Sequence, residues 1–420
     1  MRLPEDVQRR IKARVEGYRE EMIEFQRRLT AISGLGPDNG GEGEEPRAQF
    51  LENYLREAGL PAPRRVDAPD PRVPAGRRPN LVLRVPGGDA PALWVLCHLD
   101  TVPPGDLGAW SGDPLEMRVE GDRLIGRGVE DNQQGLTASL FGLRALHEEG
   151  LRPPGDVGLL LVADEESGNR YGIDFLLSTE PELVKPSDLV VVPDFGLPAG
   201  DVIETAEKGI LLMRADVHGR QVHGSMPHLG ANAHRAAAHL VVRVDQALHE
   251  AFPASDPRFD PPASTFEPTK RLANVPNINT IPGEERLWFD CRVLPRYPLE
   301  DVLRVAREAA AGLEAEFGVC VALESEASFP APPATSDDAP VVRLLGDALR
   351  ELRGVEARTI GIGGGTVGLS GARCARRRVV HHGRQRPPTG GVRPDLQPGG
   401  GRPGLRLPIC RAPTVGVGGG

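Results

Sequence analysis

The chain has 420 residues, of which 39% are apolar and 26% are charged, and its formal net charge of -9 argues against a nucleic-acid partner. This length favours two domains, and the sequence shows neither a signal-peptide core nor the roughly 20-residue apolar run of a membrane span. The five cysteines form no CxxC pair and no framework spacing, so a reduced, cytoplasmic protein is expected.

The first half of the chain alternates between helical and strand-like patterns. Apolar residues recur three to four positions apart over residues 5–31, which predicts an amphipathic helix, and a second helix is expected from Arg47 to Ala58. Leucines from Leu136 to Leu146 mark the buried face of a third helix. Apolar runs predict strands over Leu81–Val85, Ala92–Cys97, Val157–Ala163 and Asp188–Val192. Strands that alternate with helices indicate an α/β domain with a mostly parallel central sheet, whose ligands normally lie at the carboxyl ends of the strands.

After Lys208 the pattern changes to that of a smaller α+β unit inserted into the first domain. Its expected elements are, in chain order, a strand over Ile210–Val217, a loop over His223–His228, a helix over Ala231–Phe252, a strand pair formed by Asn277–Ile281 and Arg286–Val293 around a Pro282–Gly283 turn, a helix over Leu303–Phe317 and a strand over Val319–Glu324. This order is typical of a ferredoxin-like fold. Val341–Leu352 resumes the first domain, which ends at the glycine-rich turn Gly361–Thr366. The predicted division is residues 1–207 with 326–368 for the first domain, 208–325 for the inserted one, and 369–420 for a separate tail.

Acidic and histidine side chains follow several of these apolar runs. They are His98, Asp100, Asp131, Glu165, Glu166 and Asp194. Each segment has an ordinary alternative by itself: a polar turn for His98 and Asp100, a helix N-cap for Asp131, and a solvated loop for the other acids. Their conjunction at one edge of an α/β sheet favours a functional site, because one imidazole and several carboxylates suit a pair of divalent metals and an activated water.

Two spacings within this set indicate more specific chemistry. His98 and Asp100 are two residues apart at a strand end, so both side chains can point to one face, as in a metal-bound imidazole whose second nitrogen is held by a carboxylate. Glu165 and Glu166 are adjacent and would face opposite ways in an extended chain. One of these carboxylates can therefore bind metal while the other reaches the attacking water.

These segments resemble the acetylornithine deacetylase, succinyl-diaminopimelate desuccinylase and carboxypeptidase G family of di-zinc metallohydrolases. The resemblance extends over roughly residues 15–368. It continues through the segments Gln221–Pro227, Gly230–Ala233, Asn279–Gly283 and Asp290–Arg292. The resemblance implies a catalytic domain with an inserted lid that serves for dimerisation.

The resemblance also implies a metal site with two zinc ions per subunit. His98 and Asp194 would bind one zinc, Asp131 would bridge the two, and Glu166 would bind the second. Asp100 would orient the His98 imidazole. Cobalt or manganese could replace zinc, because imidazole and carboxylate ligands suit all three metals.

The implied activity is hydrolysis of an amide bond in an N-acyl amino acid, with Glu165 as the general base. Glu165 would take a proton from water and pass it to the leaving nitrogen. A carboxypeptidase or dipeptidase of the same family is one alternative, and a catalytically impaired relative that only binds such ligands is another. A nucleotide-binding protein is disfavoured because no strand–GxGxxG–helix unit is present, and no GxSxG motif supports a serine hydrolase.

Further residues would come from the lid and from the glycine-rich turn. The resemblance implies a homodimer in which His223 reaches the active site of the partner subunit. Asn279, Arg292 and the turn at Gly365 and Thr366 would hold the carboxylate and the tetrahedral oxyanion of the substrate. By itself, His223 could equally cap the helix that follows it, and Arg292 could be solvated; an arginine remains well suited to a carboxylate.

Residues 369–420 do not continue this pattern. They carry ten arginines, a single acid (Asp395), no lysine, no aromatic residue and twelve glycines, so they contribute +9 to the charge and leave -18 to the first 368 residues. The family pattern ends with an Ala-His-Gln-Pro-like segment whose histidine completes the second zinc site, and this sequence has no such segment. A composition of this kind is not expected to supply the strand and helix that close an α/β domain.

A change of reading frame near Gly368–Leu369 explains the tail. Residues 386–393 can be encoded so that the frame one base later reads Ala-His-Gln-Pro-Val-Glu-Tyr, and the flanking residues, shifted alike, supply a strand and an amphipathic helix. We therefore predict that the sequence as written slips frame there, through a sequencing error or a true mutation. The alternative is a natural basic extension that binds acidic partners.

Overall fold

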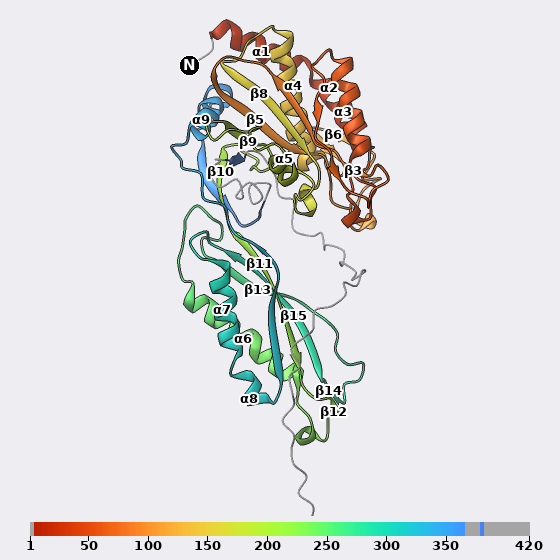
Figure 1. Ribbon diagram of the computed structural model, residues 1–420, viewed down its shortest axis with the longest axis vertical. Coiled ribbons are helices and arrows are strands. Elements are labelled where there is room, and N and C mark those ends of the chain that lie inside the picture. The colour runs from red at the N-terminus through yellow and green to blue at the C-terminus, as the bar shows by residue number, and fades with distance from the viewer. Residues whose placement is uncertain (1–3, 366–378, 382–420) are drawn as a thin grey trace, which may run out of the picture.

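Two bodies follow one another along the long axis of the protein (Figure 1). The computed structural model describes residues 4–365 and 379–381. Within these residues the larger body contains an eight-stranded sheet and the smaller body a four-stranded sheet, and three two-stranded ladders complete the β-structure. The chain passes into the smaller body in its middle part and then returns to the larger one (Figure 1).

The eight-stranded sheet has a parallel centre and antiparallel pairs towards its edges. Its strand order is β1 (Arg64–Arg65), β4 (Leu81–Val85), β8 (Gly155–Val162), β5 (Ala90–His98), β9 (Leu189–Val192), β18 (Val379–His381), β10 (Val202–Glu207) and β17 (Arg358–Ile362). The strands from β8 to β18 run parallel, whereas β4 and β10 are antiparallel to their neighbours β8 and β18. The predicted α/β class is confirmed, and the carboxyl ends of β8, β5 and β9 meet at one edge.

Helices cover both faces of this sheet. One face packs against α1 (Glu5–Gly17), α2 (Arg19–Thr30), α3 (Glu45–Glu57) and α4 (Gln134–Glu148), the other against α5 (Ile173–Thr179), and α9 (Pro340–Arg353) packs near β9 and β10. Side chains alternate along a strand, so Leu81 joins the core of the first face and Val82 that of the second. The Phe25 ring lies edge-on to Tyr54 and Phe141, with ring centroids 4.8 and 5.8 Å away. These aromatic contacts join α2, α3 and α4 into one layer.

The helix predicted over residues 5–31 is two helices, so that prediction is wrong in one respect. Gly17 ends α1, and Tyr18 adopts φ -87° and ψ 1° before α2 begins. The Tyr18 ring packs edge-on against Phe141, and its hydroxyl donates a hydrogen bond to Glu148 at 2.7 Å. The break bends the chain over α4, while the apolar periodicity continues across it and therefore does not reveal it.

One short strand comes from the tail that was predicted to supply none. Val379–His381 forms β18, which pairs with β9 on one side and β10 on the other. Two consecutive β-branched valines favour extended backbone, and without β18 the facing edges of β9 and β10 would lack backbone partners. The prediction is therefore wrong for these three residues. The rest of the tail, with the predicted change of frame, lies outside the described residues.

The smaller body, called the lid from here on, is an antiparallel sheet with helices on one face. Its strand order is β13 (Thr265–Arg271), β15 (Glu284–Val293), β11 (Gly209–His218) and β16 (Cys320–Phe329), and its helices are α6 (Ala233–Ala251), α7 (Leu299–Ala310) and α8 (Leu313–Phe317). Figure 1 shows the three helices on the same side of the sheet. Every second residue of β15 is buried, whereas Arg214 and Glu324 pair on the open face. Strand β16 continues to Phe329, beyond the predicted boundary at residue 325.

The strand pair predicted around Pro282–Gly283 is wrong. Strand β14 (Thr280–Ile281) pairs with β12 (Val222–His223), and the outer neighbour of β15 is β13. Pro268 interrupts the strand pattern of β13, but a proline is tolerated there because β13 is an edge strand. The β12–β14 ladder lies at the end of the lid farthest from the eight-stranded sheet (Figure 1).

Close packing joins the lid to the eight-stranded sheet. Lys208 alone separates β10 from β11, and its buried Nζ donates to the carbonyls of Pro261 and Ala263 at 2.9 and 2.5 Å. Gly361 of β17 lies against the Phe259 ring, where a Cβ atom would come within 2.4 Å of a ring carbon. Packing against Phe259 therefore requires a glycine at position 361 of the glycine-rich segment.

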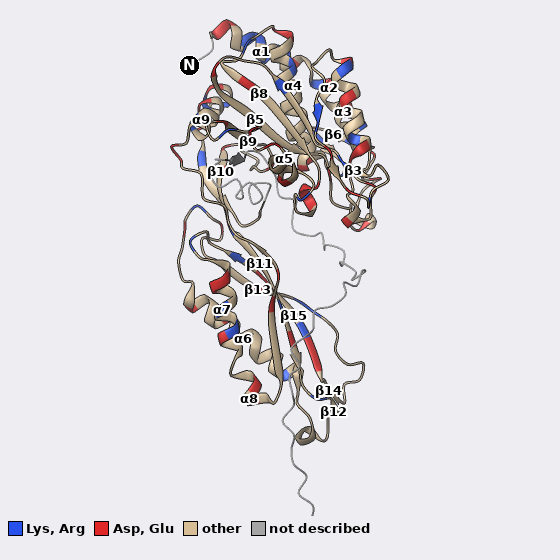
Figure 2. Ribbon diagram, viewed as in Figure 1, with Lys and Arg blue, Asp and Glu red and all other residues tan. Residues whose placement is uncertain are grey.

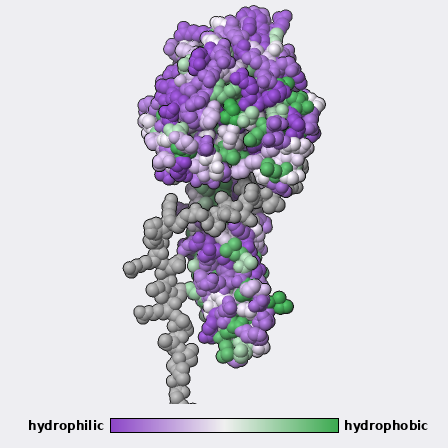
Figure 3. Space-filling view, turned by 90° about the vertical axis from the view of Figure 1, so that its right-hand side faces the viewer, coloured by the Kyte–Doolittle hydropathy of each residue, from purple (hydrophilic) through white to green (hydrophobic). Residues whose placement is uncertain are grey.

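The surface of the protein is polar and of mixed charge. Figure 2 shows acidic and basic residues interspersed along α1, α2 and α3 without a continuous basic face. Polar residues dominate the face seen in Figure 3, and apolar ones form scattered patches. Among the described residues, no helix combines the length and the apolar character that crossing a membrane requires.

Candidate metal centre

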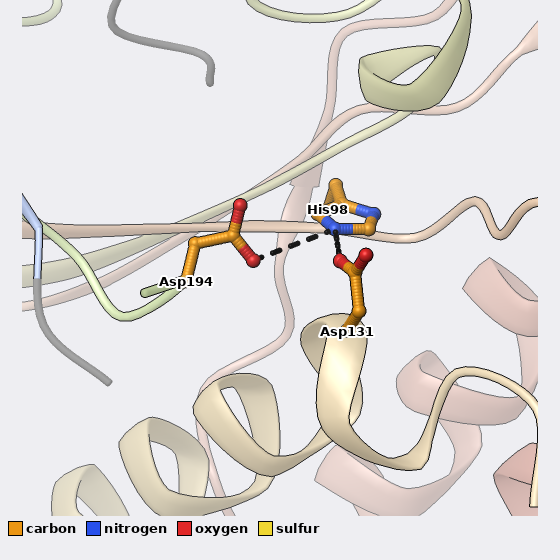
Figure 4. A group of neighbouring side chains, drawn as sticks. All are labelled: His98, Asp131 and Asp194. Carbon is orange, nitrogen blue, oxygen red and sulfur yellow. Dashed lines mark hydrogen bonds and ion pairs between the residues drawn. The ribbon is translucent and has the colours of Figure 1, made fainter. Parts of the chain in front are cut away.

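His98, Asp131 and Asp194 meet at the carboxyl edge of the eight-stranded sheet (Figure 4). His98 is the last residue of β5, Asp194 follows β9, and Asp131 lies with non-helical backbone angles in the segment Val129–Gln133 before α4. His98 Nε2 is 3.0 Å from Asp131 Oδ1 and 3.8 Å from Asp194 Oδ1. The sheet brings His98 and Asp194 together because β5 and β9 are parallel neighbours.

Asp100 connects the His98 imidazole to the turn that follows β8. The Asp100 carbonyl is 3.0 Å from His98 Nδ1, and its carboxylate is 3.4 Å from the same nitrogen. The two carboxylate oxygens accept hydrogen bonds from the backbone N–H groups of Glu165 and Glu166, at 3.0 and 2.9 Å. Burial lowers the pKa of His98, but the hydrogen bond with Asp100 and the charges of Glu165 and Asp194 outweigh it and hold that pKa well above its ordinary value. Asp100 thus contacts both the imidazole and the glutamate turn.

Glu165 and Glu166 begin a short turn, Glu165–Ser167, which two residues separate from the end of β8. Burial raises the pKa of Glu165 well above its ordinary value; the nearby His98 opposes this shift and the charge of Asp194 adds to it. Burial likewise raises the pKa of Glu166 to about 7. These shifts reflect burial first and the neighbouring carboxylates second, and buried carboxylates gathered in this way favour a divalent cation.

Two groups of potential ligand atoms share His98. The first contains His98, Asp131 and Asp194, and the second contains His98, Glu165 and Glu166; within each group the ligand atoms lie within 4.8 Å of one another. Imidazole nitrogen and carboxylate oxygen suit zinc and related divalent metals, so these residues fit a metal site. No such group among the described residues contains both Asp131 and Glu166, the pair predicted to share the second metal.

His223 and Asn279 lie together at the far end of the lid. Asn279 Nδ2 is 3.5 Å from His223 Nε2, and His223 Nδ1 is 2.8 Å from the Ser225 hydroxyl. Both side chains are exposed. They come from the β12–β14 ladder and the loop beside it, and Figure 1 shows that ladder at the far end of the lid. The structure therefore does not bring either residue to His98 of the same chain.

Arg292 lies at the junction of the two bodies. Its Nη1 donates to the Gly363 carbonyl at 3.2 Å, and its Nε and Nη2 donate to the Asp290 carboxylate at 2.6 and 2.9 Å. Gly365 is exposed, and Thr366 lies outside the described residues. Arg292 is thus next to the glycine-rich turn, while Asp290 binds one side of its guanidinium; its predicted role in holding the substrate stays a prediction.

Asn132 is a residue of this site that the sequence reading missed. Its Nδ2 donates to Asp194 Oδ1 at 2.9 Å and to the Pro193 carbonyl at 3.0 Å, and the side chain is buried. In the sequence, its position directly after the candidate ligand Asp131 was the feature that could have pointed to it. Asn132 orients the carboxylate oxygen of Asp194 that faces His98.

Asn132→Ala is expected to weaken metal binding by about 10–100-fold, because it removes a hydrogen bond that orients the carboxylate of the candidate ligand Asp194. Calorimetric titration of the metal-free protein with zinc measures this change. Asn274→Ala is the matched control: it removes an amide that binds Glu285 in the lid, and it should leave zinc affinity unchanged. Equal zinc affinities in the two variants would contradict the role assigned to Asn132.

Comparison with known sequences identifies relatives that match most of the chain. The family described as peptidase family M20/M25/M40 matches residues 94–377. An uncharacterized metallohydrolase of Methanocaldococcus jannaschii is 34% identical over 371 residues, which cover 83% of this chain and 88% of the relative. The succinyl-diaminopimelate desuccinylase of Gluconobacter oxydans is 31% identical over 304 residues, 69% of this chain and 72% of that enzyme.

Solved structures share the fold. A tripeptidase from Staphylococcus aureus superposes with a TM-score of 0.66 at 20% identity, covering 87% of this chain and 89% of that one. A metallo-carboxypeptidase of family M20 from Sulfolobus solfataricus also gives a TM-score of 0.66, at 17% identity, covering 86% and 91% of the two chains. Because the family match spans most of the chain and includes every candidate metal ligand, the protein belongs to peptidase family M20/M25/M40 and is a metal-dependent hydrolase.

Proposed function

We propose that the protein hydrolyses the amide bond of an N-acyl amino acid, as a deacetylase or desuccinylase does, with two zinc ions at the candidate metal centre. The observation that carries this proposal is the gathering of two pairs of carboxylates, Asp131 with Asp194 and Glu165 with Glu166, around His98 at one sheet edge. The 31% identity with the desuccinylase of Gluconobacter oxydans supports an acyl amino acid as substrate. We expect the enzyme to act in the cytoplasm.

The residues divide into metal ligands and a proton carrier. Divalent metals at such a centre lower the pKa of the attacking water and polarise the amide carbonyl. His98 and Asp194 would hold one metal, Glu166 the other, and Asp131 both. Glu165 is assigned to proton transfer: its raised pKa suits a group that takes a proton from water and delivers it to the leaving nitrogen.

We further propose that the lid completes the site of a second copy in a homodimer. His223 and Asn279 are exposed at the far end of the lid, away from His98 of their own chain, which supports a role in another protomer. Arg292 and the turn at Gly365 and Thr366 are assigned to the carboxylate and the oxyanion of the substrate. An arginine fork suits a carboxylate in geometry and charge.

Hydrolysis of short peptides is the second candidate. Two solved structures with the same fold are those of the tripeptidase from Staphylococcus aureus and of human carnosine dipeptidase 1, the latter with a TM-score of 0.64 at 14% identity over 90% of this chain and 92% of that one. Peptides and N-acyl amino acids share the amide bond and the free carboxylate, so the same residues serve both. A catalytically impaired relative is the third reading, because the histidine predicted for the second metal is missing from the sequence as written.

With zinc added, we expect hydrolysis of one class within a panel of N-acetyl amino acids, N-succinyl amino acids and dipeptides. Chelation should lower the rate by at least about 100-fold and added zinc should restore it, because the metal supplies several kcal/mol of transition-state stabilisation. Release of free amine measures the rate, and elemental analysis gives the zinc content. If no substrate is hydrolysed and the protein holds one zinc ion or none per chain, the result would favour a catalytically impaired relative that only binds such ligands.

A further inference from the structure

A buried ion pair lies outside the candidate metal ligands. Arg78, the last residue of β3 (Arg77–Arg78), and Glu44, directly before α3, are both 0% exposed. Arg78 Nε donates to Glu44 Oε2 at 2.6 Å, and Arg78 Nη2 pairs with Oε1, so the contact is bidentate. Burying two charges is costly, and a two-residue edge ladder does not need such a pair for its own hydrogen bonds. The pair therefore calls for an explanation beyond local stability.

The ion pair reaches the turn that carries the two glutamates. Arg78 Nη1 is 3.4 Å from Asp164 Oδ1, and Glu44 Oε1 accepts a hydrogen bond from the Asp164 N–H at 3.4 Å. Asp164 has φ +64°, a left-handed conformation that non-glycine residues rarely adopt. Its second carboxylate oxygen accepts from the Tyr171 N–H at 3.0 Å. Arg78 and Glu44 thus hold both the backbone and the side chain of the residue that precedes Glu165.

Asp100 holds the same turn from the other side. Its carboxylate accepts the N–H groups of Glu165 and Glu166, whereas the contacts of Arg78 and Glu44 are with Asp164. The turn with the two glutamates is therefore held at two points: by the Asp100 carboxylate at Glu165 and Glu166, and by the buried Arg78–Glu44 pair at Asp164. A shift of either support would change where the carboxylates of Glu165 and Glu166 lie.

The second buried arginine has a different task. Arg47 Nε donates to the Ile32 carbonyl at 2.8 Å, and its Nη1 donates to the Leu99 carbonyl at 3.0 Å. These contacts fix the backbone directly after His98 and make no bond to the glutamate turn. Of these two buried arginines, Arg78 is therefore the one that contacts the turn, through Asp164.

We propose that Arg78 is a positioning residue that, through Glu44 and Asp164, sets the place of Glu165 and Glu166 in the metal centre. This inference rests on the proposed function, because the two glutamates matter as proton carrier and metal ligand. It assigns a role to a residue that contacts no candidate metal ligand. A purely structural ion pair would affect the stability of the fold and leave metal affinity and turnover unchanged.

Arg78→Met, compared with Arg77→Met, tests the proposal in the full-length chain. Arg77 is the neighbouring residue on the same strand, and it pairs with Glu45 at 3.4 Å and Asp67 at 3.3 Å without contacting the turn. For Arg78→Met we expect zinc affinity to fall about 10-fold and kcat about 100-fold, with KM within about 3-fold of the unaltered value. For Arg77→Met we expect all three quantities to stay within about 2-fold.

The readouts are calorimetric titration of metal-free protein with zinc, steady-state kinetics, and the melting temperature of each variant. Unchanged zinc affinity and kcat in a folded Arg78→Met protein would overturn the proposal. If Arg78→Met does not fold, Asp164→Asn removes the charge on the turn while the Arg78–Glu44 pair remains. Loss of zinc affinity in that variant supports the proposal, and unchanged affinity overturns it. Should the unaltered protein hydrolyse no substrate of the panel, the proposed function fails while the zinc titration still decides the role of Arg78.

Discussion

A protein whose reading frame is restored after Gly368 is expected to hydrolyse its substrate at least about 100-fold faster than the chain as written. In the restored frame, the segment around Pro387 and Pro388 reads Ala-His-Gln-Pro. The histidine of this segment would complete the second metal position. A metal held at that position would supply several kcal/mol of transition-state stabilisation, and each 1.36 kcal/mol corresponds to a factor of ten in rate. Kinetics of the two proteins with the same zinc supply measure the difference.

The restored protein with its new histidine replaced by alanine is the matched control, and we expect it to behave like the chain as written. Zinc content should follow the same order, near two per chain in the restored protein and fewer in the other two. Equal activity in all three would mean that the second metal needs no C-terminal histidine. Nucleotide sequencing across Gly368–Leu369 is the direct test of the frame, and an intact frame there would refute our account of the tail.

Replacing each of the two adjacent glutamates should have a different consequence. Glu165→Gln is expected to lower kcat by about 10³-fold with zinc content and KM little changed, because an amide cannot take the proton of the attacking water. Glu166→Gln is expected to lose zinc from one position, because an amide is a weaker ligand than a carboxylate. The two effects are distinguished by kinetics and elemental analysis. Both variants are made in whichever protein is more active, the chain as written or the one with the restored frame.

Glu180→Gln is the control for this pair. Glu180 forms an ion pair with Arg64 at the surface of the same body, so its replacement should change neither kcat nor zinc content. If Glu165→Gln released zinc while Glu166→Gln retained it, the two roles would have to be exchanged. If both variants kept full activity, the glutamate turn would have no part in the chemistry.

The sheet and the edge at which the candidate metal ligands gather could be predicted because buried parallel strands leave a continuous apolar pattern. Strand β8 is almost wholly apolar from Val157 to Val162, and β5 reads likewise up to His98. Parallel neighbours end at the same edge, so residues that follow such runs meet in space. The proximity of His98 and Asp194 follows from this rule, and no further information was needed.

Other features depend on tertiary contacts that leave no pattern in the sequence. Arginine and glutamate are ordinarily found at the surface, so nothing in the local sequence distinguishes Arg78 and Glu44 from their exposed neighbours. No strand was predicted over β13. Its Pro268 conflicts with a central strand, and the edge position that tolerates a proline becomes known only once the sheet is assembled. The hydrogen bond of Asn132 to Asp194 likewise requires the two segments to be in place.

The position of the β12–β14 ladder has a consequence for how the protein works in solution. Under the proposed dimer, the exposed His223 serves a centre built by another copy, so specific activity falls when dilution separates the two. Two inactive proteins, Glu165→Gln and His223→Ala, would regain activity on mixing, because a hybrid pair holds one centre with both groups intact. The active species would then be the dimer, and its concentration would rise with the square of the concentration of free monomer.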